Sequence, residues 1–145
     1  MKNILISECL LGINCKYNGG NNHRDFVEEL SEKYNLIPFC SEILGGLPTP
    51  RVASERCGNK VINKEGIDVT ENFIRGADET LKLAEIFKCE MAIVKSKSPS
   101  CGYGEVYDGS FSKNLISGNG YTVDLLIENG VQIYTENDVD KILEL

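Results

Sequence analysis

Three cysteines of this sequence, Cys9, Cys40 and Cys101, each follow a short apolar run of the kind that forms a buried strand. The runs occupy residues 3–7, 35–39 and 91–95. In an open α/β sheet, ligands bind outside the carboxyl ends of the parallel strands. If the three runs are parallel neighbours, we expect their thiols to meet at that edge of the sheet.

Three thiolates that meet at one point suit an iron–sulfur cluster, which is usually held by four cysteines. With only three, one iron stays open to a substrate or water and acts as a Lewis acid. The spacing does not resemble a zinc ribbon, since no two cysteines form a CxxC pair. The alternative is that cysteine is a small buried apolar side chain. We favour that alternative for Cys57 and Cys89, and leave the role of Cys15 open.

Polar residues beside these cysteines are candidates for proton transfer and substrate contact. Glu42, two residues after Cys40, would lie close to a cluster and could transfer a proton. It could instead cap a helix or pair with Arg51. Ser98 and Ser100 could hold a substrate oxygen or nitrogen, or bond only to the backbone of their own loop, as serines commonly do.

Two further segments are candidates for binding substrate. Arg51 is fixed just after Pro50, so it could clamp an anion or a carbonyl, although a solvated surface arginine is equally compatible with the sequence. Gly118, Asn119 and Gly120 precede a predicted helix, and their amides could donate hydrogen bonds to an anion or a substrate carbonyl.

The elements that must position these residues alternate between strands and helices. A fourth strand is predicted at 131–134, and helices at 23–34, 68–88, 121–128 and 136–143. Asp68 and Glu71 have the spacing of a capping box. We predict a shaped loop at 40–51, a small hairpin around 59–63, and pairing of 105–107 with 110–112. The alternation predicts an α/β fold, one doubly wound domain over residues 1–145 with a mostly parallel sheet.

Composition limits the function classes. The chain has 145 residues and a net charge of −7, which disfavours a nucleic-acid polymer as the main partner. No apolar run is long enough to span a bilayer, and the start of the chain does not resemble a signal peptide. We therefore expect a cytoplasmic protein. Six cysteines in that reducing compartment suggest metal ligation or reactive thiols rather than disulfides.

Four motifs together resemble a small bacterial family, once catalogued as a domain of unknown function, that includes thiouracil desulfurase. The similarity covers nearly the whole chain. The motifs are Ser7-Glu8-Cys9-Leu10-Leu11-Gly12, the segment from Cys40-Ser41-Glu42 to Pro48-Thr49-Pro50-Arg51, Gly66-Ile67-Asp68-Val69-Thr70, and Ser98-Pro99-Ser100-Cys101-Gly102. The chain departs from the family pattern in two places, with Ser41 where proline is more frequent and Glu8 where a small residue is usual.

The resemblance implies a Rossmann-like domain with a [4Fe–4S] cluster on three cysteines, which map to Cys9, Cys40 and Cys101. It implies a small thiolated base as substrate, from which the open iron takes sulfur without net redox change. By the same resemblance Glu42 is the acid/base, and a catalytic serine lies in the segment Ser98-Pro99-Ser100.

Two other functions remain open from the sequence. One is a non-catalytic module that binds an iron–sulfur cluster or metal and senses or stores iron and sulfur. The other is a nucleotide-binding domain in which the cysteines only pack. Bound iron separates the first two hypotheses from the third, and turnover of a thiolated base separates desulfuration from storage. The sequence does not indicate the oligomeric state.

Overall fold

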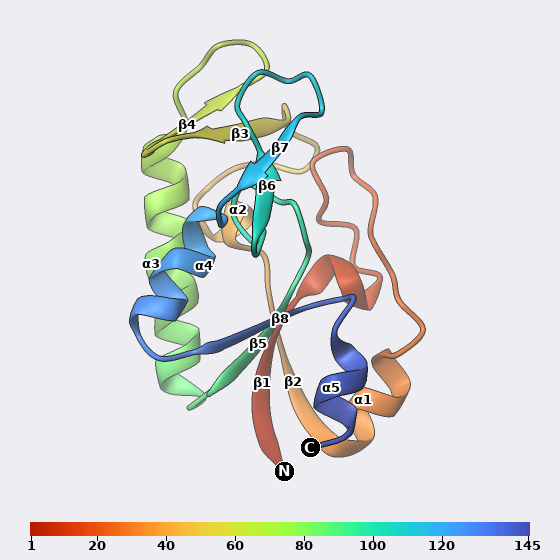
Figure 1. Ribbon diagram of the computed structural model, residues 1–145. Coiled ribbons are helices and arrows are strands. Elements are labelled where there is room, and N and C mark those ends of the chain that lie inside the picture. Colours follow the sequence, from red (N-terminus) through yellow and green to blue (C-terminus); the bar gives the residue numbers. More distant parts are fainter.

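A four-stranded parallel sheet forms the centre of the molecule. The computed structural model describes residues 1–145, and its sheet has the order β2-β1-β5-β8 with every neighbouring pair parallel (Figure 1). The strands are β1 (Lys2–Ser7), β2 (Tyr34–Phe39), β5 (Met91–Val94) and β8 (Gln132–Thr135). Each predicted strand lies within one residue of these bounds. The predicted α/β fold with a mostly parallel sheet is confirmed.

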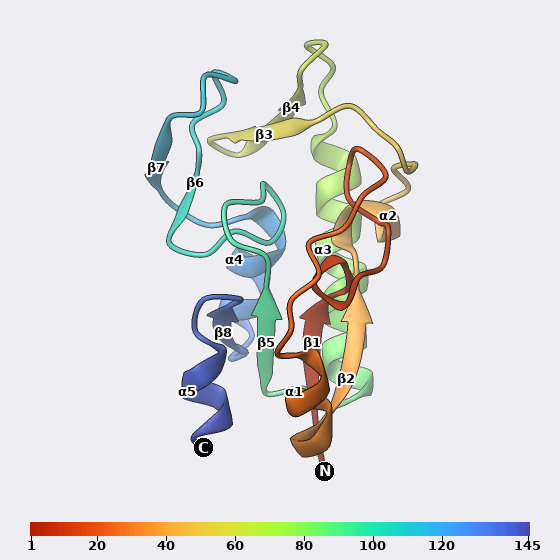
Figure 2. The ribbon, with the colours of Figure 1, turned by 90° about the vertical axis from the view of Figure 1, so that its right-hand side faces the viewer.

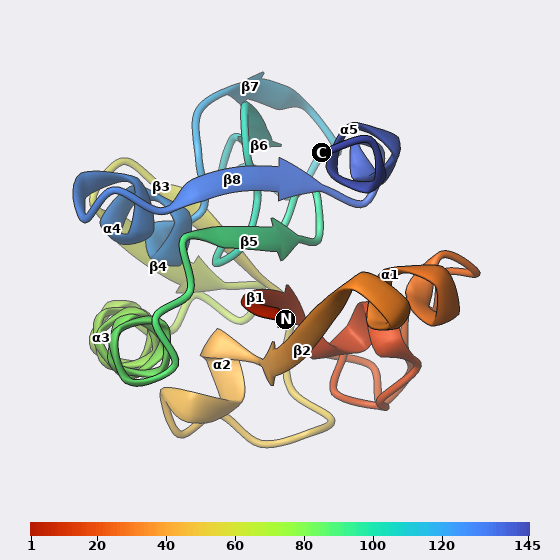
Figure 3. The same ribbon diagram turned by 90° about the horizontal axis from the view of Figure 1, so that it is seen from below.

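Helices cover both faces of this sheet. Helices α3 (Thr70–Ile86) and α4 (Tyr121–Glu128) lie on one face, whereas α1 (Val27–Lys33) and α5 (Val139–Leu143) lie on the other (Figure 3). Successive side chains along β1 point to opposite faces of the sheet, so this strand packs against the helices on both faces. Leu5 packs with residues of α3 and α4, while its neighbours Ile4 and Ile6 pack with those of α1 and α5. None of the helices is both long enough and apolar enough to cross a membrane.

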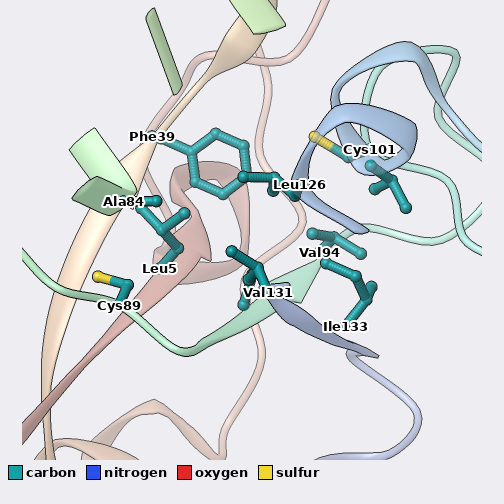
Figure 4. Packing of buried hydrophobic residues seen from close by; sticks show 11 residues of the cluster. Leu5, Phe39, Ala84, Cys89, Val94, Cys101, Leu126, Val131 and Ile133 are labelled. Atoms are coloured by element: carbon teal, nitrogen blue, oxygen red, sulfur yellow. The ribbon is translucent and has the colours of Figure 1, made fainter. Parts of the chain in front are cut away.

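The larger core cluster lies between the sheet and α3 and α4. Phe39 of β2 and Leu126 of α4 are almost fully buried there, and burial of such a side chain contributes about 1.5–3 kcal/mol. Cys89 and Cys101 lie at opposite ends of this cluster (Figure 4). The core thus extends from the amino ends of the strands to the edge where Cys101 is placed.

Two antiparallel hairpins stand above the carboxyl ends of the strands (Figure 2). One pairs β3 (Ser54–Cys57) with β4 (Lys60–Asn63), and the other pairs β6 (Glu105–Tyr107) with β7 (Leu115–Ser117). Glu55 of β3 joins them, because its carboxylate accepts hydrogen bonds from the amides of Gly109 (3.0 Å) and Phe111 (3.1 Å). This shared carboxylate fixes one hairpin against the other.

The predicted pairing of 105–107 with 110–112 is wrong. Strand β6 pairs with Leu115–Ser117 because residues 108–114 form a wide loop. Asp108 closes one end of that loop by accepting a hydrogen bond from the amide of Ser110 at 2.9 Å, and Phe111 and Lys113 adopt positive φ. The predicted hairpin around 59–63 is present, with 60–63 as its second strand.

Other local predictions also need correction. The segment 40–51 contains a one-turn helix, α2 (Ser41–Leu44), and Glu8–Leu11 form a 3₁₀ turn, η1. Helix α1 begins at Val27 rather than near residue 23, because the segment before it bonds to η1, with the Asn22 amide donating to the Cys9 carbonyl at 2.9 Å. Asp68 accepts from the Thr70 amide at 2.9 Å, but no capping box forms.

Helices α2 and α3 approach each other closely at Gly76. A Cβ atom at this position would lie 2.0 Å from the backbone oxygen of Ser41. Ser41 is buried, and its hydroxyl hydrogen-bonds with that of Thr122 on α4. Gly76 therefore allows the one-turn helix to sit against both long helices of this face.

We expect Gly76→Ala to destabilise the protein. Alanine in a helix interior normally stabilises by about 1 kcal/mol relative to glycine, but here overpacking reverses the sign, and we expect a loss of about 2 kcal/mol or more. Urea unfolding measures this difference. Gly66→Ala is the control, since its site has positive φ and open space and should lose only about 1 kcal/mol. A stabilised Gly76→Ala variant would contradict the packing.

Candidate active site

The order in which the chain adds strands to the sheet reverses between β1 and β5, which makes this position a topological switch point. From β1 the chain proceeds to β2 on one side, and it later returns to β5 on the other side of β1. Ligands of doubly wound folds bind outside the carboxyl ends of strands at such a point. Cys9 in η1, Cys40 directly after β2 and Cys101 in the loop after β5 all line one cavity there, of about 480 Å³.

A fourth thiol, that of Cys15, lies in the same cavity. It is buried and hydrogen-bonds with the thiols of Cys9 and Cys40. Sequence reasoning left this residue open, although its place in the loop after β1, six residues beyond Cys9, was the available signal. Cys57 is exposed on β3, and Cys89 is buried at the far end of the core, so neither lines the cavity.

The thiols of Cys9 and Cys101 differ in acidity. The hydrogen bond from Cys15 is the main cause that lowers the pKa of Cys9 to about 7, assisted by a hydrogen bond from Asn22 and the charge of Lys95. Complete burial raises the pKa of Cys101 to about 12. The contact with Cys15 also lowers the pKa of Cys40. Before any ligand binds, Cys9 is therefore the readily ionised thiol of this pair.

Glu42 lies between an arginine and a serine. The Arg51 Nε atom donates to one carboxylate oxygen of Glu42 at 3.1 Å, and the Ser100 hydroxyl donates to the other at 3.0 Å. The Ser98 hydroxyl lies 3.1 Å from that of Ser100, and its oxygen accepts hydrogen bonds from the amides of Ser100 and Cys101. The structure thus connects the two loops that carry Cys40 and Cys101 through Glu42 and the serines.

Arg51 lies in the cavity wall, and its side chain is only 5% exposed. Besides Glu42, its guanidinium donates to the carbonyl of Cys15 at 3.0 Å and to that of Pro48 at 3.3 Å. These contacts exclude a solvated surface arginine. Through them the guanidinium positions the loops of the cavity wall. The expected contact of Arg51 with substrate stays a prediction.

The segment Gly118-Asn119-Gly120 lies beside the cavity loop rather than in the cavity lining. The Gly120 amide donates to the Gly102 carbonyl at 2.7 Å, and the Asn119 side chain accepts from the Gly104 amide at 2.9 Å. A Cβ atom on Gly120 would lie 2.3 Å from the carbonyl carbon of Ser100. The segment therefore supports the loop of Cys101, and its predicted role in binding substrate stays a prediction.

Positive side chains predominate around the cavity. Six cations line it against three carboxylates, although the whole chain has a net charge of −7. The cations are Lys16, Arg51, Lys64, Lys95, Lys97 and Lys113, and the carboxylates are Glu8, Glu42 and Glu55. Lys95 is held by the buried carboxylate of Glu136 at 3.3 Å. Sequence reasoning missed this patch, because its lysines come from separate loops.

This fold and this cavity define an α/β protein with thiols gathered at the switch point of its sheet. The sequence model of the 2-thiouracil desulfurase family matches residues 4–138. The chain therefore belongs to that family.

Two known proteins are similar to this chain over nearly its whole length. The uncharacterized protein YbbK of Bacillus subtilis (strain 168) is 37% identical over 150 residues, which cover 97% of this chain and 99% of YbbK. The solved structure of the [4Fe-4S]-dependent thiouracil desulfidase TudS superposes with a TM-score of 0.92. It is 36% identical, and the match covers 97% of this chain and 95% of that one.

The acidity of Cys9 can be measured by alkylation of the cluster-free chain. We expect its rate of reaction with iodoacetamide to rise with a midpoint near pH 7, because the thiolate is the nucleophile. Cys15→Ala should move the midpoint upward, since it removes the largest stabilising contact. Mass spectrometry of the Cys9 and Cys101 peptides measures both thiols, and the exposed Cys57 reports reagent access in the same samples. Equal reactivity of Cys9 and Cys101 at pH 7 would contradict the assigned environments.

Proposed function

We propose that this protein removes sulfur from a thiolated nucleobase of the thiouracil type. Water would replace sulfur at the carbon, so that C=S and H₂O become C=O and H₂S without net redox change. The observation that carries the proposal is the presence of three strand-end thiols, Glu42 and two serines in one cavity. The family assignment supports the same reaction class.

We propose that Cys9, Cys40 and Cys101 hold a [4Fe–4S] cluster. The donor set fits, because cysteine thiolates are the usual ligands of such clusters and these three reach the cavity from three different strand ends. When bound, the cluster would supply one open iron as a Lewis acid with affinity for soft sulfur. The neighbour TudS, described as [4Fe-4S]-dependent, supports this choice of cofactor.

The protein's own residues would manage the proton. We propose that Glu42 accepts a proton from the attacking water at the carboxylate oxygen that Ser100 contacts. Arg51 fixes the other oxygen and so aims the carboxylate. Ser98 and Ser100, 3.1 Å apart, would orient the base or pass the proton onward. This division gives Glu42 the acid/base role and the serines a role in orientation.

The positive lining suggests the form in which the base is bound. Four lysines of the cavity have no carboxylate partner within ion-pair distance, and they are Lys16, Lys64, Lys97 and Lys113. Free ammonium groups around a cavity attract anions. A nucleobase becomes an anion when it carries a phosphorylated ribose. We therefore propose that a phosphorylated thionucleoside binds better than the free base.

We further propose that residues 1–145 act as one domain on small molecules in the cytoplasm. Both core layers pack on a single sheet, which supports one folding unit. All six cysteines are free, which suits a reducing compartment. The net charge of −7 disfavours a nucleic-acid polymer as a substrate.

Glu42→Gln separates cofactor binding from chemistry. Glutamine keeps the size and hydrogen bonding of glutamate but cannot take up a proton. We expect unchanged iron and sulfide content but a loss of about 10²–10⁴-fold in the rate of sulfide release from a thiolated base. Cys101→Ser should instead lose iron and activity together, whereas Cys57→Ser should lose neither.

Three outcomes would contradict this division of roles. Wild-type turnover by Glu42→Gln would make the glutamate structural, and loss of iron in that variant would place it among the ligands. A wild-type chain that holds the cluster but releases no sulfide from any thiolated base or nucleotide would support the non-catalytic module. Anaerobic purification with iron and sulfide analysis precedes each assay.

The preference for a phosphorylated substrate can be tested by replacing two of the four cavity lysines that have no carboxylate partner. We expect Lys97→Met with Lys113→Met to raise the KM for a phosphorylated thionucleoside about 10-fold, because hydrogen bonds to charged groups contribute about 1.5–3 kcal/mol. The KM for the uncharged base should not change. Lys82→Met, on the outer surface of α3, is the control. Equal effects on both substrates would show that the lysines do not recognise the phosphate.

A further inference from the structure

One group of side chains in the cavity wall has the spacing of a single metal ion. A carboxylate oxygen of Glu8 and the sulfur atoms of Cys15 and Cys40 all lie within 4.8 Å of one another. Cys15 is buried, and the other two are partly buried. Cys40 thus belongs to two sets of ligand atoms, one with Cys9 and Cys101 and one with Glu8 and Cys15.

The two sets suit different metals. Zinc binds thiolate sulfur at about 2.3 Å and carboxylate oxygen at about 2.0–2.2 Å, so the ligands of one tetrahedral zinc lie about 3.5–3.8 Å apart. The ligand atoms of Glu8, Cys15 and Cys40, which lie within 4.8 Å of one another, would have to move closer by only about 1 Å to reach that spacing. Thiolates of an iron–sulfur cluster each bind a different iron, and so they must lie farther apart than ligands of one ion.

The backbone around Cys15 is already fixed. The Arg51 guanidinium donates to its carbonyl at 3.0 Å, and its own amide donates to the carbonyl of Ile13 at 2.8 Å. Cys40 is held at the start of α2. Little loop ordering is therefore needed before these side chains bind an ion.

We propose that Glu8, Cys15 and Cys40 bind one Zn²⁺ in the cluster-free chain, with water in the fourth position. This zinc site shares Cys40 with the proposed cluster, but its existence does not depend on the desulfuration proposed above. Thiol protons are released to solvent when the ion binds. Because Cys40 is shared, zinc and the cluster exclude each other. As a ligand, Cys15 would bind zinc alone, and Cys101 would bind the cluster alone.

Metal binding to the full chain tests the site directly. The protein is freed of iron with a chelator under anaerobic reducing conditions and titrated with Zn²⁺ against a chromogenic competitor. We expect one Zn²⁺ per chain. Cys15→Ser and Glu8→Gln should each weaken binding by more than the roughly 10–100-fold that loss of an outer hydrogen-bond partner costs. Cys101→Ser and Cys57→Ser should bind Zn²⁺ as the wild type does.

Cobalt provides a second readout on the same samples. Co²⁺ in place of Zn²⁺ should show sulfur-to-cobalt charge-transfer absorption that weakens in Cys15→Ser and persists in Cys101→Ser. Circular dichroism verifies that each variant is folded. If Cys15→Ser does not fold, Glu8→Gln decides, since its side chain lies at the cavity wall rather than in the core.

Assembly of the iron–sulfur cluster distinguishes the zinc site from the cluster site. Cys15→Ser should take up iron and sulfide to the wild-type level, and preloaded Zn²⁺ should block assembly in the wild type but not in Cys15→Ser. Wild-type zinc affinity in Cys15→Ser, or loss of zinc in Cys101→Ser, would overturn the proposal. A wild-type chain that binds Zn²⁺ but never assembles a cluster would refute the proposed function and leave the zinc site intact.

Discussion

Arg51 holds together the parts of the cavity wall that the sheet does not reach. Its guanidinium bonds to the Glu42 carboxylate after β2 and to the Cys15 carbonyl in the loop after β1. A buried cation is costly unless it is paired and its donors are satisfied, and both conditions hold here. Removing one partner of such a buried pair typically costs about 3–5 kcal/mol. The positions of Glu42 and Cys15 therefore depend on the same side chain.

Close contacts between backbone segments are equally important on the side of the cavity that faces α3 and α4. Gly120 lies against the backbone of Ser100, and Gly76 against that of Ser41, at distances that no side chain permits. Each contact places a helix of the α3–α4 layer directly behind a loop that carries a cavity residue. Because protein interiors transmit small displacements, the packing of this layer and the geometry of the cavity are coupled.

The strands and the placement of the thiols could be predicted because they depend on local patterns. Apolar runs define the four strands, and parallel strands necessarily bring their carboxyl ends to one edge, which is where Cys9, Cys40 and Cys101 lie. The lysine lining and the contacts of Cys15 could not be predicted, since they arise where separate loops meet. The loop 108–114 was misread because a distant carboxylate, Glu55, fixes its backbone. The glycines of segment 118–120 suggested amides that are free to bind a ligand, yet the amides of Gly118 and Gly120 donate to the carbonyls of Gly104 and Gly102.

The hairpins β3–β4 and β6–β7 are inserted in the connections that follow β2 and β5, and they stand above the carboxyl ends of the strands (Figure 2). The thiols of Cys9, Cys40 and Cys101 line the floor of the cavity beneath them. Surface connections tolerate changes of length and sequence far better than a packed sheet does. The entrance and the floor of the cavity are thus separate modules in evolutionary terms. Descendants of such a chain can exchange hairpins and admit differently shaped compounds, while the cysteine thiols beneath keep their positions.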